Sequence, residues 1–153
     1  MLTGLGEQAL LAEPMVAFFA SRQCPGTAIR AAMDWVLLQA KTRQVVIGGF
    51  HSPLEQSVLQ VLLQARNPVV LVLARPVADA KLSPDWLAAI ADGYMTVVSA
   101  STKTQRLTNA LAAQRNELTV KLATSVVIAH ASPTGGLAAQ CEFWMESKAL
   151  RFL

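Results

Sequence analysis

Cysteine is scarce in this chain, and neither Cys24 nor Cys141 belongs to a CxxC motif or to a spacing that could hold zinc. The simplest interpretation is a reduced, cytoplasmic protein in which Cys141 is a small core residue. Long hydrophobic runs are also missing, since none approaches the roughly 18 to 20 residues of a membrane helix. The N-terminal stretch has no basic segment and carries Glu7 and Glu13, which is not typical of a signal peptide. We therefore expect no membrane partner.

Charged residues are few, at 15% of the chain, whereas hydrophobic residues make up 53%. The mean hydropathy of +0.39 favours buried strands that are covered on both faces of a sheet. A length of 153 residues is enough for one domain with a sizeable core. The net charge of +3 indicates a mild preference for anionic partners.

Short hydrophobic runs alternate with helical patterns along the chain. We expect strands at 15–20, 45–47, 69–73, 95–98 and 124–129, with an edge strand at 150–153. We expect helices at 27–40, 53–65, from Ser83 onward, 104–122 with a break near 115–116, and 136–147. This alternation predicts one α/β domain over residues 1–153, a three-layer α/β/α Rossmann-like fold with a doubly wound, mainly parallel sheet. Residues 1–13 are expected to be held most loosely.

Ligands of an open parallel sheet bind beyond the carboxyl ends of its strands. The loops expected there contain small hydroxyl residues, glycines, basic residues and both histidines, but no Asp or Glu. Helix N-termini add N–H donors, so the pattern favours an anion, most simply a phosphate, cradled by loops such as 132–136. The predicted ligand-binding residues are Ser21, Arg22, Gly48, Gly49, His51, Ser52, Arg75, Ser101, Lys103, Ser132, Thr134, Gly135 and Gly136.

Plainer interpretations exist for each of these residues. The glycines could form tight turns, and the Ser and Thr residues could be ordinary helix N-caps. No loop matches GxxxxGK[ST] or GxGxxG. His51 and His130 could act as ligands or as acid–base groups, alone or in a metal site with Cys24, but hydrogen bonding that orders the loops is the simpler role. We predict no metal and no cofactor.

Three stretches carry a family resemblance: Ser21-Arg22, VVIGGFHS at 45–52, and QRNELTVKLATSVVIAHASPTGGL at 114–137. Over about residues 15–147 the chain resembles the Rossmann domain of the DNA-processing family (DprA/Smf). The matching positions are Ser21, Arg22, Gly48, Gly49, Arg115, Asn116, Leu122, Ala123, Gly135 and Gly136. The resemblance implies binding of single-stranded DNA through its phosphates, by a loader of a recombinase during transformation. It adds Arg115 and Asn116 to the predicted site, and Phe50 could stack a base or simply pack.

The chain departs from the family pattern in several places. Ser52-Pro53-Leu54 stands where the family has Gly-Ile-Asp, and Glu117 replaces a second arginine. There is no room for the helical N-terminal domain or the winged helix of many members, so a minimal, stand-alone version is expected.

An enzyme is the alternative interpretation. The wider superfamily includes lysine-decarboxylase-like enzymes that cleave the glycosidic bond of nucleoside monophosphates with a PGGxGTxxE loop, which 132–137 partly matches. Gln140 occupies the place where the acid of that loop is expected, and Glu142 is six residues past Gly136. An ion pair with Arg115 is the plainer role of Glu117. The sequence therefore predicts a non-catalytic phosphate-binding module for nucleotide or single-stranded DNA, with no catalytic residue, and it is compatible with a homo-oligomer. The alternative is a nucleoside-monophosphate hydrolase.

Overall fold

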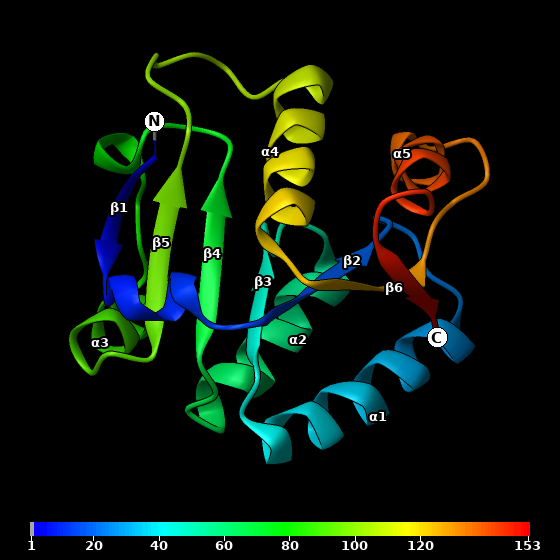
Figure 1. Ribbon diagram of the computed structural model, residues 1–153, viewed down its shortest axis with the longest axis horizontal. Coiled ribbons are helices and arrows are strands. Elements are labelled where there is room, and N and C mark those ends of the chain that lie inside the picture. The colour runs from blue at the N-terminus through cyan, green and yellow to red at the C-terminus, as the bar shows by residue number, and fades with distance from the viewer. Residues whose placement is uncertain (1) are drawn as a thin grey trace.

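Seven strands form a single sheet in the order β1-β5-β4-β3-β2-β6-β7 (Figure 1). The structure is a computed structural model and describes residues 2–153. The strands are β1 (Thr3–Gly6), β2 (Met15–Ala20), β3 (Val45–Gly48), β4 (Val69–Leu73), β5 (Met95–Ser99), β6 (Ser125–His130) and β7 (Ala149–Phe152). The helices are α1 (Gly26–Thr42), α2 (Pro53–Gln64), α3 (Pro84–Ala91), α4 (Asn109–Leu122) and α5 (Gly136–Trp144), with 3₁₀ turns η1 (Gln8–Ala12) and η2 (Val77–Asp79).

Every pair of neighbouring strands from β5 to β7 is parallel, as the alternating pattern predicts. From β2 the chain moves outward through β3 and β4 to β5, and then returns to the other side of β2 to add β6 and β7. The direction of winding therefore reverses between β2 and β6, which is where ligands of open α/β sheets bind. The predicted doubly wound fold is confirmed.

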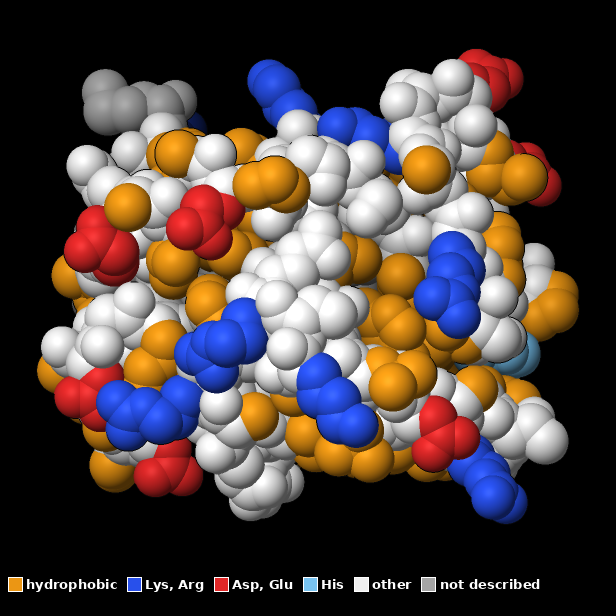
Figure 2. All heavy atoms as spheres, turned by 60° about the horizontal axis from the view of Figure 1, so that its bottom comes forward, with side chains coloured by type: hydrophobic (Ala, Val, Ile, Leu, Met, Phe, Trp, Pro, Cys, Tyr) orange, Lys and Arg blue, Asp and Glu red, His pale blue; other side chains and the backbone are white. Residues whose placement is uncertain are grey.

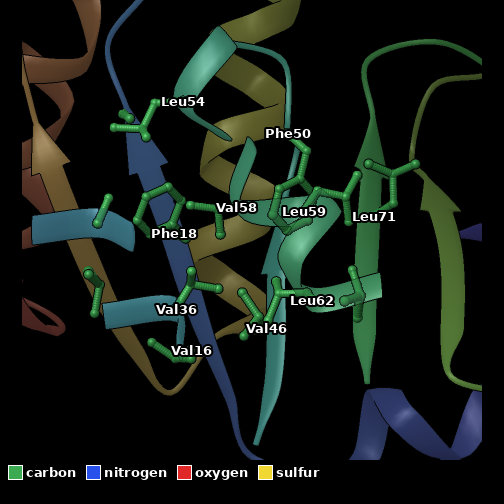
Figure 3. Close-up of a cluster of buried hydrophobic side chains, with 14 of the residues drawn as sticks. Val16, Phe18, Val36, Val46, Phe50, Leu54, Val58, Leu59, Leu62 and Leu71 are labelled. Atoms are coloured by element: carbon green, nitrogen blue, oxygen red, sulfur yellow. The ribbon is translucent and has the colours of Figure 1, made fainter. Parts of the chain in front are cut away.

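Helices cover both faces of the sheet and bury two hydrophobic layers. One layer lies under α1, α2 and α3, and the other lies under η1, α4 and α5. Figure 3 shows the first layer, where Phe18 and Val46 of neighbouring strands point toward Val58 and Leu62 of α2. These α2 residues recur at helical spacing, so the pattern that predicts the helix also supplies its buried face.

The described part of the N-terminal segment forms β1 and η1, two elements that the sequence pattern did not predict. Residues 3–6 pair with residues 96–99 as an antiparallel strand, and Thr96 Oγ1 donates a hydrogen bond of 2.7 Å to the Glu7 carbonyl. Leu10 is buried in the second hydrophobic layer. The physical reason is the edge of the sheet: without β1, the backbone groups of β5 would be left open.

The segment after β5 also differs from the prediction. The helix begins at Asn109, capped by Thr108, rather than at Thr104, and it continues without a break through Arg115. The Thr108 hydroxyl accepts a hydrogen bond from Leu111 N, which explains the late start. Among residues 2–153, no helix is both long and apolar enough to cross a membrane.

Candidate functional site

A cleft of about 410 Å³ lies at the carboxyl ends of β3 and β4. It is lined by Gly49 and His51 after β3, by Arg75 after β4, and by Arg115 of α4. A second hollow of about 240 Å³ lies beside it and is lined by residues 100–103 after β5. Arg115 lines both hollows, so this one guanidinium group stands between them. The predicted residues Ser101 and Lys103 belong to the second hollow.

The Arg115 side chain lies directly against Gly49. A Cβ placed on Gly49 would come within 2.5 Å of Arg115 Nε and 2.8 Å of its Cζ, so only glycine leaves space for the guanidinium. Burial lowers the pKa of Arg115, and the nearby Glu55 carboxylate partly opposes this shift. Nη2 donates to Asn116 Oδ1 at 3.3 Å, whereas the buried Nε has no partner among the described residues. The Arg115 side chain lines both hollows, so its charged guanidinium is placed where an anion in either hollow could meet it.

A buried carboxylate orders the loop that carries Gly49 and His51. Ser52 caps α2, and Glu55 closes the capping box by accepting from Ser52 N at 3.1 Å. The same carboxylate accepts from His51 N at 2.9 Å and from Ala20 N, at the end of β2, at 3.0 Å. Glu55 thus fixes the ends of two neighbouring strands relative to each other. The Ser52 hydroxyl is buried and serves as the cap, so the structure gives it a local structural role.

The exposed His51 side chain experiences the positive charge of the site. Its pKa is lowered by partial burial first, then by Arg115, and further by Arg22 and Arg75, while Glu55 opposes the shift. Arg115 of α4 and the loop residues Arg22 and Arg75 therefore all act on one side chain at the carboxyl edge. Figure 2 turns the opposite end of the strands toward the viewer, and there basic and acidic side chains are interspersed among hydrophobic ones.

The loops after β2 and β6 are bonded to each other at the point where the sheet reverses direction. Ser21 N donates to the His130 carbonyl, and Ser21 Oγ accepts from Ser132 N, each at 2.8 Å. Gly135 N donates to the Ser132 carbonyl at 2.9 Å, which closes a turn within the loop. Thr134 and Gly136 are exposed at the start of α5. Residues 130–136 do not line the 410 Å³ cleft, so the predicted residues form two adjacent groups.

Asn116 and Glu117 pack α4 against α5. Asn116 Nδ2 donates to Gln140 Oε1 at 3.1 Å, which directs its amide toward α5. Glu117 Oε1 accepts from Gln140 Nε2 at 3.0 Å and from Trp144 Nε1 at 3.1 Å. Within residues 2–153 Glu117 makes no ion pair with Arg115, so the ion pair expected from the sequence is wrong.

The cleft contains residues that the sequence pattern did not single out. Asp79 of η2 lines it, and its carboxylate accepts a hydrogen bond from the Thr104 hydroxyl. The loops that directly follow the strands contain no Asp or Glu, but the chain folds back after Arg75 and places Asp79 in the cleft. Trp86 also lines the cleft, and its place in the first turn of α3, just after the cap Ser83, could have indicated this. Phe50 is 2% exposed, so it packs in the core and does not present a stacking surface.

The histidine and cysteine residues form no obvious metal centre. Cys24 Sγ donates to the Ser21 carbonyl at 3.1 Å, and burial raises the pKa of its thiol. In the part of the chain that the structure describes, no three His, Cys, Asp or Glu side chains are grouped so that they could hold a metal ion.

Comparison with known families and structures gives a consistent result. The family model for DNA recombination-mediator protein A matches residues 1–149. A comparison with curated proteins gave no match.

Solved structures share the fold at low sequence identity. DNA processing protein A from Streptococcus pneumoniae is 20% identical, with a TM-score of 0.81 over 99% of this chain and 54% of its own. DNA processing protein A from Helicobacter pylori, whose structure concerns its binding of single-stranded DNA, is 17% identical, with a TM-score of 0.75 over 99% and 70%. The molybdenum cofactor binding protein from Rippkaea orientalis is 15% identical, with a TM-score of 0.62 over 92% and 76%. The chain spans about half the length of the Streptococcus protein.

Proposed function

The chain belongs to the DNA recombination-mediator protein A family, and on that premise we propose that its carboxyl edge binds single-stranded DNA through phosphate groups without catalysing a reaction. The Helicobacter relative with the same fold binds single-stranded DNA. In this chain the proposal is supported most strongly by Arg115, whose guanidinium is held against Gly49 between two hollows.

The basic groups around Arg115 lie along a path that a strand could follow. Arg75 lines the hollow on one side of Arg115, and Lys103 lines the hollow on the other side. Both side chains are exposed. Successive phosphates of a single strand would meet Arg75, Arg115 and Lys103 in turn.

The carboxylates near the site do not favour the hydrolase alternative. Cleavage of a glycosidic bond passes through a cation-like transition state that needs a positioned acid or base. Glu55 is buried and accepts three backbone N–H groups, and Asp79 accepts from Thr104. Glu142 is exposed on α5, away from the residues that line the cleft. These carboxylates have structural partners or lie elsewhere, which supports a binding role.

The proposal is tested by titrating the protein into a fluorescently labelled oligonucleotide of about 12 nucleotides, within the usual span of such sites, at several salt concentrations. We expect binding that weakens with salt, and R115A and R75A should each make the slope of log affinity against log salt about 0.7 less negative. K41A is the matched control, because it removes one exposed positive charge from the last turn of α1. Affinity that is independent of salt, or equal losses in K41A and R115A, would contradict the proposal. Binding of mononucleotides but not of oligonucleotides would identify a free nucleotide as the ligand.

A further inference from the structure

A further groove, the α2–α3 groove, lies between α2 and α3. It is next to the 410 Å³ cleft lined by Arg75 and Arg115, which we call the basic cleft. The groove has a volume of about 500 Å³, its floor is formed by Leu59 and Leu63 of α2, and Trp86 and Tyr94 form its opposite wall. Trp86 and Gln56 line both the α2–α3 groove and the basic cleft, so the groove is continuous with the cleft. Gln56 Nε2 also donates to the His51 carbonyl at 2.9 Å, which fixes the end of the groove to the loop of the site.

The chemistry of this groove differs from that of the cleft. Gln56, Gln60 and Gln64 recur every four residues and place three exposed amides along one side of α2. The opposite side contributes the indole of Trp86 and the carboxylate of Asp85. Arg66 lies over the Tyr94 ring, 4.9 Å from its centroid, and pairs with Asp92. The groove therefore offers apolar and aromatic surface with amide groups, and the carboxylate of Asp85 disfavours a phosphate.

We propose that the α2–α3 groove binds nucleobases of the strand whose phosphates occupy the basic cleft. This inference rests on the proposed function. A base has an aromatic face that stacks on an indole ring, and its edge carries donors and acceptors that match a glutamine amide. The side chains of Gln60 and Gln64 are exposed and line the groove, so their amides are available to such an edge. Continuity with the phosphate path through Trp86 and Gln56 makes a base the best-matched occupant.

The test compares an oligo-dA strand with an abasic strand of the same length and charge. Trp35 and Trp144 are 7% and 3% exposed, so Trp86 is the tryptophan best placed to report a ligand by its fluorescence. We expect oligo-dA to quench this fluorescence and the abasic strand to leave it unchanged. W86L should remove the quenching and weaken oligo-dA binding roughly five- to tenfold, the lower end of the range expected for one stacked base.

Q60A is the second variant, because it truncates an exposed side chain and should fold normally. It should weaken oligo-dA binding severalfold while abasic binding and the salt dependence stay the same. L87A is the control: Leu87 is the neighbour of Trp86 on α3, is 52% exposed and does not line the groove.

The outcomes separate this inference from the function on which it rests. If both strands bind equally in wild type, W86L and Q60A, and the fluorescence does not respond, the groove does not bind bases although the phosphate site stands. If neither strand binds, both proposals are overturned. Losses of equal size in L87A and Q60A would also overturn the base site, because they would reflect a general effect on the surface.

Discussion

Replacing Gly49 with alanine tests whether the guanidinium of Arg115 binds the anion. The new Cβ would lie 2.5 Å from Arg115 Nε and 2.8 Å from its Cδ and Cζ. Ordinary contact between such atoms is about 3.5 to 4.0 Å, so the guanidinium must move by about 1 Å or more. Gly49 does not adopt a positive φ, so alanine fits its backbone and the side chain of Arg115 is the part that gives way.

The expected effect on binding follows from one misplaced charged donor. A hydrogen bond to a charged group contributes about 1.5 to 3 kcal/mol. Partial displacement of the Arg115 guanidinium should therefore cost about 1.5 kcal/mol of binding free energy, the lower end of this range. We therefore expect G49A to weaken oligonucleotide binding about tenfold and to leave the folding transition in urea nearly unchanged. G26A is the matched control, since a Cβ at Gly26 would meet nothing within 4 Å.

A double-mutant cycle with R115A decides whether the reasoning is correct. If alanine at position 49 acts only by displacing Arg115, it has little further effect once that side chain is removed. Anisotropy titrations of the wild type, both single variants and the double variant give the coupling energy. Independent, additive losses would refute the argument, because they would show that Gly49 contributes through its own backbone.

Two further predictions concern protonation and the core. Binding of an oligonucleotide should tighten as the pH falls through and below 6.5, the ordinary pKa of histidine: the free His51 has a lowered pKa, and a bound phosphate favours its charged form. H51Q should abolish this dependence in titrations at several pH values. L62A should lower the free energy of unfolding by about 3 kcal/mol in urea denaturation, since Leu62 is fully buried under the sheet, whereas L38A, at a residue that is 63% exposed, should change it by less than about 0.5 kcal/mol.

The central strands could be predicted from the sequence because their burial is encoded locally. Val69–Leu73 is a run of β-branched and aliphatic residues between turn signals, and the structure reproduces its limits. β1 could not be predicted in this way, because the sequence TGLG has low strand propensity and forms a strand only through its pairing with β5. Its structure is a consequence of tertiary pairing at the edge of the sheet.

The residues of the cleft that directly follow a strand could be predicted from the sequence. The sequence placed Gly49, His51 and Arg75 at one edge, and the structure brings them into one cleft with Arg115. Side-chain contacts across the chain were not predictable. The capping motif after β3 indicates where α2 begins, but not that the Glu55 carboxylate also reaches Ala20, which is 35 residues away.

The hydrogen bond between Glu55 and Ala20 provides a test that distinguishes a binding module from a hydrolase. In E55Q one carboxylate oxygen becomes an amide donor that faces a backbone N–H group, so a buried hydrogen bond is lost and a donor is left unpaired. We expect the free energy of unfolding to fall by about 2 to 4 kcal/mol, and we expect wild-type protein incubated with AMP, CMP or GMP to release no free base in a chromatographic assay. E142Q, at an exposed residue of α5, should change neither property. Release of base that E55Q abolishes, together with unchanged stability, would identify Glu55 as a catalytic acid. Its hydrogen bonds from Ala20, His51 and Ser52 argue instead that it holds the loop after β3 in place.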